Sequence, residues 1–253
     1  MKDASLNERL TNALSLTVSP LAITFSNEPV GASTPEAAVP AGCSFWELGT
    51  KQSLTTSAVD HQFCSIGVHT HNLRDAVASH GTELEAALGA MTGLGYVKPD
   101  EVAGIPVMSE SYAYVTYGPL ADAKGPVSIV LVVADANRSL TLTEAVARVD
   151  GGAPPAMGRP ACALVPQVAN SRAAAASLGC CGARAYMDSL TDSIVLWGFP
   201  GERLEAYVEA IEVLAKANTI LSKFHTERRR AVESGASPTI KDSLDALDAL
   251  EAR

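Results

Sequence analysis

The sequence predicts an α/β fold, with mixed α+β as the alternative, built as a single compact domain with a long C-terminal helix. Apolar runs of strand length alternate with segments of helical period, which favours helices packed on a sheet. Of the 253 residues, 47% are hydrophobic and 19% are charged, a composition typical of a globular protein. An apolar stripe also continues through about thirty residues near the C-terminus. These three observations together predict the fold class.

The first half of the chain alternates helix, strand and loop. Residues 5–16 carry leucines at helical spacing, and Ser5 and Glu8 have the spacing of a capping box, so we expect an amphipathic first helix. The short apolar run at 21–25 predicts a strand. The following segments are expected to be a Pro-, Gly- and Ala-rich loop, a helix, an irregular segment and a second helix, in the order 27–42, 43–51, 57–72 and 84–94.

The second half contains the clearest strand. Aromatic and β-branched residues predict a strand at 112–117. The nearly continuous apolar run at 127–133 indicates a strand that is buried on both faces. The remaining elements are expected to be a helix, a further apolar strand, a late strand and the long helix, in the order 142–149, 161–168, 194–199 and 202–234.

The long helix bears on domain organisation. We expect one domain over residues 1–235, followed by a tail or short helix over 236–253, because Gly235 and Pro238 end the helical pattern. Packing across the sheet is the favoured role of the helix. The alternative is a homodimer seam, in which Asn218 would pair with its symmetry mate.

Composition excludes several classes of function. Nineteen basic residues against twenty-eight acidic ones give a net charge of −9, which argues against a dedicated nucleic-acid binder. No apolar run is long enough to cross a membrane, and the first residues lack the apolar core of a signal peptide. We therefore expect a cytoplasmic protein. Its five cysteines would be reduced there, so metal, redox or core roles are favoured over disulfides.

Histidine and cysteine gather in the segment 60–72. His61 and Cys64 stand three residues apart, and His69 and His71 stand two apart, so that in an extended segment both of the latter would point to one side. Imidazole and thiolate are the usual ligands of zinc, iron and copper. The segment predicts a ligand or cofactor site, although a polar loop that merely collects histidines is the alternative.

A second group of thiols follows near residue 180. Cys180 and Cys181 lie between glycines, on a loop whose backbone is free to bend toward a metal or cluster. Arg184 would lower the pKa of a nearby thiolate. The alternatives are two small buried hydrophobic residues or a vicinal disulfide. Cys43 and Cys162 stand apart from both groups. For Cys43 alone an inert core role is the ordinary interpretation, whereas for Cys162 a small core residue and a functional role are both open.

Taken together, the motifs resemble those of domain-of-unknown-function family 169, over roughly residues 5–225. The resemblance implies a shared site but no established reaction. It singles out four cysteines and two histidines as matching positions, whereas Cys181 falls where the pattern allows other residues. The residues that carry it are Asp60-His61-x-x-Cys64-x-Ile66-Gly67-x-x-Thr70-His71-Asn72, Gly158-Arg159-Pro160-x-Cys162 and Ser177-Leu178-Gly179-Cys180-x-Gly182-x-Arg184-x-Tyr186.

The leading hypothesis is a cytoplasmic metalloprotein that binds an iron–sulfur cluster of the 4Fe-4S type. Four thiols from separate segments of a reduced chain suit such a cluster, and Cys43, Cys64 and Cys180 would bind it with Cys162 as the fourth ligand. With three thiols only, an open iron would accept a small-molecule substrate. The protein would then be a redox or small-molecule-transforming enzyme, with an electron-transfer partner in the redox case.

Other side chains have expected roles around that centre. His61 or His71 would act as a further ligand or as a general acid or base. Arg184 and Tyr186 would orient an anionic substrate. Two alternatives stay open. One is a mononuclear zinc or a haem held by His61, Cys64 and His71, and the other is a non-enzymatic dimeric binding protein with its cysteines in the core.

Overall fold

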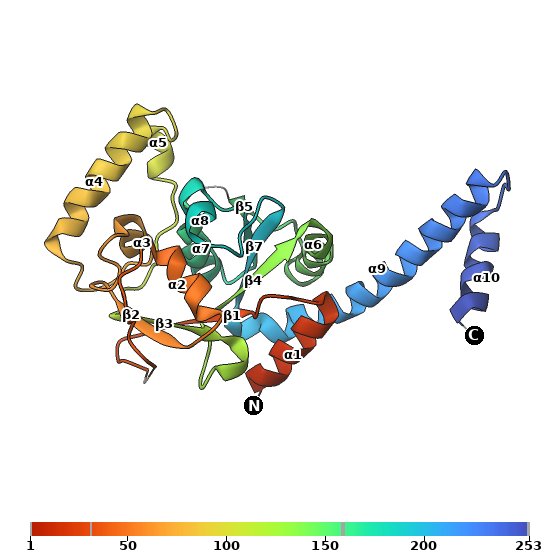
Figure 1. The fold of residues 1–253 in the computed structure, drawn as a ribbon, viewed down its shortest axis with the longest axis horizontal. Coiled ribbons are helices and arrows are strands. Elements are labelled where there is room, and N and C mark those ends of the chain that lie inside the picture. The colour runs from red at the N-terminus through yellow and green to blue at the C-terminus, as the bar shows by residue number, and fades with distance from the viewer. Residues whose placement is uncertain (1, 31, 158–159, 252–253) are drawn as a thin grey trace.

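The protein folds around one seven-stranded sheet, in a computed structural model that describes residues 2–30, 32–157 and 160–251 (Figure 1). The strand order is β2-β3-β1-β4-β7-β6-β5, and every neighbouring pair is antiparallel except β5 with β6. The strands are β1 (Leu21–Ser26), β2 (Leu54–Ser57), β3 (Tyr114–Pro119), β4 (Ile129–Asp135), β5 (Ala156–Met157), β6 (Ala175–Ser177) and β7 (Ile194–Pro200). The fold is therefore mixed α+β, as one form of the prediction stated.

Helices connect these strands and cover the sheet on both faces. The α-helices are α1 (Lys2–Leu14), α2 (Gly42–Gly49), α3 (Ser65–Thr70), α4 (Ala78–Gly93), α5 (Pro99–Val102), α6 (Ala136–Asp150), α7 (Leu164–Ser171), α8 (Cys181–Tyr186), α9 (Leu204–Glu233) and α10 (Ile240–Glu251). Short 3-10 turns are η1 (Leu120–Asp122), η2 (Ala161–Ala163) and η3 (Gly201–Arg203).

Alternation along the strands separates two cores. In β4, Leu131 faces one core while its neighbours Val130 and Val132 face the other. The first core packs against α2, α3, α7 and α8, and the second packs against α1, α6 and α9. Because β4 is covered on both sides, its residues Ile129–Val132 are all buried, as the continuous apolar run indicated. Of the cysteines that the sequence singled out, Cys43 and Cys162 lie in the first core and Cys180 packs against it.

The strand expected at 161–168 is wrong, because this segment forms η2 and most of α7. Its residues are buried almost without interruption, so neither a helical nor a strand period is visible in the sequence. The strands β2 and β6 were not anticipated. The helix α3 was not anticipated either, and it occupies six residues of the segment 57–72 that was expected to be irregular.

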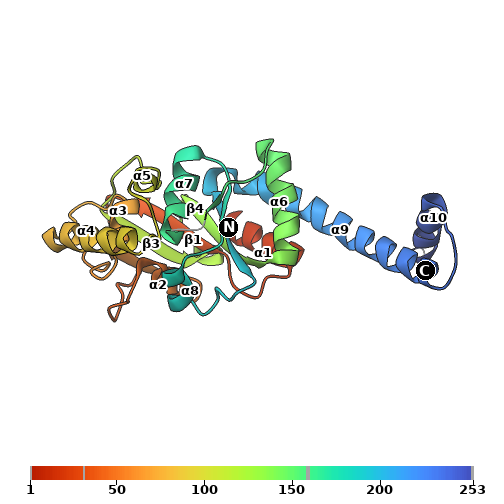
Figure 2. The same ribbon diagram turned by 90° about the horizontal axis from the view of Figure 1, so that it is seen from above.

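The long helix runs away from the sheet, and α10 folds back beside its far end (Figures 1 and 2). Its first half packs on the second core through buried residues such as Tyr207 and Ile211. Asn218, the residue considered for a dimer seam, donates from Nδ2 to Thr141 Oγ1 at 3.0 Å within the same chain. A homodimer stays a prediction. Within the described ranges no helix is both long and apolar enough to cross a membrane.

Candidate functional site

The motif segment 57–72 folds into consecutive turns that lead into α3. Asp60 Oδ2 accepts hydrogen bonds from the amide and the hydroxyl of Ser57, at 2.7 and 2.9 Å, which closes the first turn. The amide of Cys64 then donates to the carbonyl of His61 at 2.8 Å, and α3 begins at Ser65. The turns bring His61 and Cys64 into the first core, beside α2.

His61 is oriented by a threonine. The side chain is 1% exposed, and its Nε2 lies 3.0 Å from Thr56 Oγ1. Thr56 also donates to the carbonyl of Val115 at 3.3 Å. A hydroxyl has one hydrogen, so with that bond made we assign the ring hydrogen to Nε2, which donates to Thr56. Nδ1 then carries a free lone pair, and it has no hydrogen-bond partner among the described residues.

Two glycines, Gly42 and Gly67, pack against both the free Nδ1 of His61 and the sulfur of Cys64. A β-carbon built on Gly42 would lie 3.2 Å from His61 Nδ1 and 3.5 Å from Cys64 Sγ. One built on Gly67 would lie 4.0 Å from the same nitrogen and 2.8 Å from the same sulfur. These glycines, in α2 and α3, leave the space that the thiol and the imidazole occupy together.

Cys64 carries a half-buried thiol whose pKa is raised. Burial is the largest cause, and the nearby backbone amides of Gly42 and Gly67 oppose it. The neighbouring Cys180 raises the pKa further. Cys64 is therefore a thiol rather than a thiolate at neutral pH, with amide donors in place to stabilise the thiolate when it forms.

The buried histidines His61 and His71 are neutral. Burial lowers the pKa of His61 to about 3, and nearby His71 and His80 lower it as well. Burial also lowers the pKa of His71 to about 4, an effect opposed by the backbone of Cys162. The His61 and His71 rings stand edge to face with centroids 6.4 Å apart. Neither ring nitrogen of His71 has a partner of ordinary hydrogen-bond geometry in the described part of the chain.

The other four cysteines lie outside the pair formed by Cys64 and His61. Burial raises the pKa of Cys43 to about 12, and Cys64 and Cys180 raise it further. Burial also raises the pKa of Cys162, which is 9% exposed. Cys180 caps α8, where its sulfur accepts from the Ala183 amide at 3.4 Å. Cys181 is exposed, with its sulfur 3.9 Å from the hydroxyl of Tyr96.

The predicted iron–sulfur cluster is wrong. Across residues 2–30, 32–157 and 160–251, no three His, Cys, Asp or Glu side chains are grouped so that they could hold a metal ion. The same finding contradicts the prediction of a 4Fe-4S centre. It also contradicts the alternative of a zinc ion or a haem held by His61, Cys64 and His71. The physical reason is packing, because Cys43 and Cys162 are core residues of α2 and η2. Metal ligation needs thiolates, whereas burial favours the neutral thiols.

Arg184 and Tyr186 both lie in α8. The guanidinium of Arg184 donates to three backbone carbonyls, those of Leu178, Thr191 and Ile194, and so ties the loop before α8 to the start of β7. Tyr186 is 45% exposed. The structure gives Arg184 this structural role, and its catalytic role stays a prediction. The motif residues Gly158 and Arg159 lie outside the described residues.

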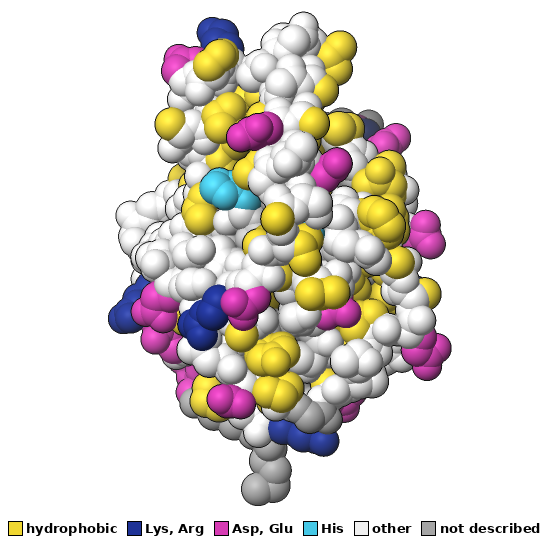
Figure 3. All heavy atoms as spheres, turned by 90° about the vertical axis from the view of Figure 1, so that its left-hand side faces the viewer, with side chains coloured by type: hydrophobic (Ala, Val, Ile, Leu, Met, Phe, Trp, Pro, Cys, Tyr) yellow, Lys and Arg dark blue, Asp and Glu magenta, His cyan; other side chains and the backbone are white. Residues whose placement is uncertain are grey.

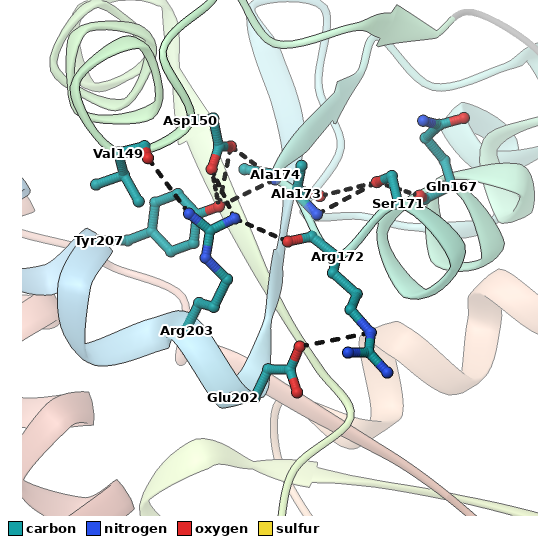
Figure 4. Close-up of polar contacts among 10 residues, drawn as sticks. All are labelled: Val149, Asp150, Gln167, Ser171, Arg172, Ala173, Ala174, Glu202, Arg203 and Tyr207. Carbon is teal, nitrogen blue, oxygen red and sulfur yellow. Dashed lines mark hydrogen bonds and ion pairs between the residues drawn. The ribbon is translucent and has the colours of Figure 1, made fainter.

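A second polar cluster, which sequence reasoning missed, lies on the other side of the sheet (Figure 4). The hydroxyl of Tyr207 lies 2.7 and 2.9 Å from the two carboxylate oxygens of Asp150, and Arg203 pairs with the same carboxylate at 2.9 Å. Arg203 also donates to the carbonyls of Val149 and Arg172. The cluster joins α6, α9 and the loop before β6, so its role is structural.

Two residues of the candidate site were also missed. Thr56 orients His61, and Gly42 makes room for the thiol, yet neither forms a motif with its partners in the sequence. For Thr56, a position in a strand five residues before His61 is the only signal, and it is a weak one. Gly42 lies more than twenty residues before Cys64, so folding alone brings them together.

The model of the DUF169 family, described as uncharacterised ArCR, matches residues 9–210. No match was found among the curated proteins or among the solved structures.

Proposed function

Because the chain belongs to domain-of-unknown-function family 169, whose description assigns no reaction, we propose a function from the site's own geometry: thiol-dependent acyl transfer, with Cys64 as the nucleophile and His61 as the proton acceptor. The substrate would be a small ester or thioester. One observation carries the proposal. The free Nδ1 of His61 and the sulfur of Cys64 lie within 3.5 Å of one shared position, the β-carbon that Gly42 lacks.

The arrangement has the parts that nucleophilic catalysis requires. A nucleophile stands beside a base, and the base is held by a third group, here the hydroxyl of Thr56 at 3.0 Å. Amides of Gly42 and Gly67 face the sulfur, where negative charge develops as the proton leaves. Cys43 and Cys162 are buried core residues, so their sulfurs are less open to a substrate than that of Cys64.

The proposed step balances within the site. The Cys64 thiol gives its proton to His61 Nδ1 as the sulfur attacks the substrate's carbonyl carbon, which forms a carbon–sulfur bond. The bond from that carbon to the leaving oxygen or sulfur breaks, and the imidazolium returns the proton to the leaving group. Water or another acceptor then takes the acyl group from Cys64. Burial of the imidazole makes it a weak base at rest, so proton transfer accompanies the attack.

The chemistry needs a reduced thiol, which bears on location. All five cysteines are free. We therefore place the protein in a reducing compartment, the cytoplasm, where thiols persist.

Acylation by p-nitrophenyl acetate tests the proposal. The wild-type chain is expected to release nitrophenol and to gain one acetyl group on the peptide that carries Cys64, detected by mass spectrometry. Cys64→Ser is expected to abolish this acetylation. His61→Gln is expected to slow it by about 10²-fold or more, the usual contribution of a general base.

Cys181→Ser is the matched control, because Cys181 is exposed and lies outside the proposed machinery. Circular dichroism melts show whether each variant is folded. Acetylation of Cys64 at the same rate in folded His61→Gln would refute the role of His61, and no acetylation of Cys64 in the wild type would refute the function.

A further inference from the structure

A pocket of about 330 Å³ lies between α3 and α4, and is here called the α3–α4 pocket. Its volume falls at the lower end of the range of roughly 300–1,000 Å³ that is usual for small-ligand sites. Its apolar lining includes the large side chains of Val68, Leu73 and Leu84. Neither Cys64 nor His61 lines it, so the pocket is distinct from the space that these two residues share.

His80 is the polar group that gives the pocket chemistry. Its side chain lines the pocket and is only 4% exposed. Neither of its ring nitrogens has a hydrogen-bond partner in the part of the chain that the structure describes. A buried imidazole without partners is unfavourable unless something supplies its hydrogen bonds. A neutral imidazole offers one donor and one acceptor, so it suits a ligand that can use either.

The surroundings of His80 select an uncharged ligand. The pocket is lined by no lysine, arginine, aspartate or glutamate among the described residues. Figure 3 faces the side of the molecule that carries α4, where hydrophobic and uncharged side chains cover most of the surface and single Asp or Glu side chains are scattered among them. A charged group that entered the pocket would leave water without an opposite charge to meet it, which is costly.

A larger hollow of about 710 Å³ lies beside β1 and β3, and charged Asp122 and Lys124 line it. Tyr117 also lines it and has an unpartnered hydroxyl among the described residues, but its ring stacks on Phe45 in the first core.

The threonine hydroxyls of this hollow already have partners, since Thr116 bonds with Thr55 at 2.8 Å and Thr24 donates to the carbonyl of Pro126 at 3.5 Å. The unpartnered nitrogens of His80 distinguish the α3–α4 pocket from the hollow.

We propose that the α3–α4 pocket binds a small organic molecule with one uncharged polar group, such as an amide or alcohol, and a short aliphatic body. The polar group bonds to His80, and the aliphatic body contacts Val68, Leu73 and Leu84. Binding needs no reaction at Cys64, so the inference does not depend on the proposed function.

Titration with hexanamide, followed by NMR of ¹³C-labelled histidine rings in the full chain, tests the proposal. The signals of His80 are expected to shift saturably, and to do so equally in Cys64→Ser. His80→Leu is expected to weaken binding at least tenfold, measured by calorimetry. It is also expected to raise the melting temperature, because it replaces an unpaired polar group by an apolar one. Hexanoate and hexylamine are expected to bind at least tenfold more weakly than hexanamide.

His225→Leu is the matched control, because His225 is exposed on α9, far along the chain from the pocket. It is expected to leave hexanamide binding unchanged. Absence of a saturable shift at His80 would mean that water alone fills the pocket and would overturn the proposal. Equal affinity in His80→Leu, or equal binding of the charged probes, would overturn it as well.

Discussion

The sulfur of Cys64 lies 2.8 Å from the point that a β-carbon on Gly67 would occupy. Real β-carbons do not approach sulfur so closely, so this glycine in α3 is required by the thiol beside it. The spacing Cys64-x-x-Gly67 is thus a packing relationship within one turn of chain, and it bears on stability as well as on the site.

Gly67→Ala is expected to destabilise the fold by about 1–3 kcal/mol, because the added methyl group overpacks a filled space. Urea unfolding measures this change. Gly89→Ala is the control, since Gly89 lies in α4 with open space around it. There the alanine is expected to stabilise the protein by about 0.5–1 kcal/mol through helix propensity. A neutral effect of Gly67→Ala would contradict the contact.

Stability is expected to fall as the pH drops from about 6 to about 4. Burial lowers the pKa of His61 to about 3 and that of His71 to about 4, so in this window the unfolded chain binds protons that the folded chain does not. Each histidine contributes a slope of about 1.4 kcal/mol per pH unit. Above the ordinary histidine pKa both states are neutral, and this contribution to the pH dependence vanishes.

Urea unfolding at pH 7, 6, 5 and 4 measures the slope. His61→Gln and His71→Gln are each expected to reduce the slope by the contribution of one histidine, about 1.4 kcal/mol per pH unit. His225→Gln, an exposed control, is expected to leave it unchanged. An unaltered slope in both buried variants would show that other groups produce the acid sensitivity.

The alkylation of Cys64 by iodoacetamide is expected to reach half its maximal rate at a higher pH than that of N-acetylcysteine. The reason is that burial raises the pKa of the thiol, and alkylation proceeds through the thiolate. Peptide mass spectrometry over pH 6–10 measures the rate at each cysteine. Cys43 and Cys162 are expected to react only through local opening, since both are buried. A half-maximal pH below that of N-acetylcysteine would contradict this account.

Tyr207→Phe is expected to lower the free energy of unfolding by about 1–3 kcal/mol. The change removes the hydroxyl from the carboxylate of Asp150 and from the amide of Ala174, while the ring stays in the second core. Tyr186→Phe is the comparison, because that hydroxyl is at the surface and its loss is expected to change stability by no more than about 0.5 kcal/mol. Equal effects in the two variants would remove the structural role assigned to the Asp150 cluster.

Much of the fold could be predicted where the sequence carries a period. The strand at 127–133 and the long helix at 202–234 correspond to β4 and α9, because a buried central strand and a helix with one apolar stripe each leave a distinct pattern. The segment 161–168 has no such pattern. Burial on all sides removes the polar positions that would distinguish helix from strand, and α7 formed where a strand was expected.

Residue types in the sequence directed attention to the segment 60–72, but the metal site predicted there was wrong. Histidine and cysteine close together in the sequence indicated metal ligands, but in the fold His61 bonds to Thr56 and Cys64 rests on two glycines. Thr56 lies on β2 only five residues before His61. Gly42, however, lies on α2 more than twenty residues before Cys64, so the fold decides which atoms meet. Spacing within one segment holds no information about that.

The segments around Cys64 enter the fold through separate parts of the chain. Helix α2, helix α3 and the turn η2 meet over one face of the sheet, although they begin at Gly42, Ser65 and Ala161. Contacts of such wide sequence separation form slowly, because closing a long loop costs conformational entropy. The buried thiols can therefore be used to time this step. A pulse of alkylating reagent during refolding would record when α2, α3 and η2 come together and protect the cysteines.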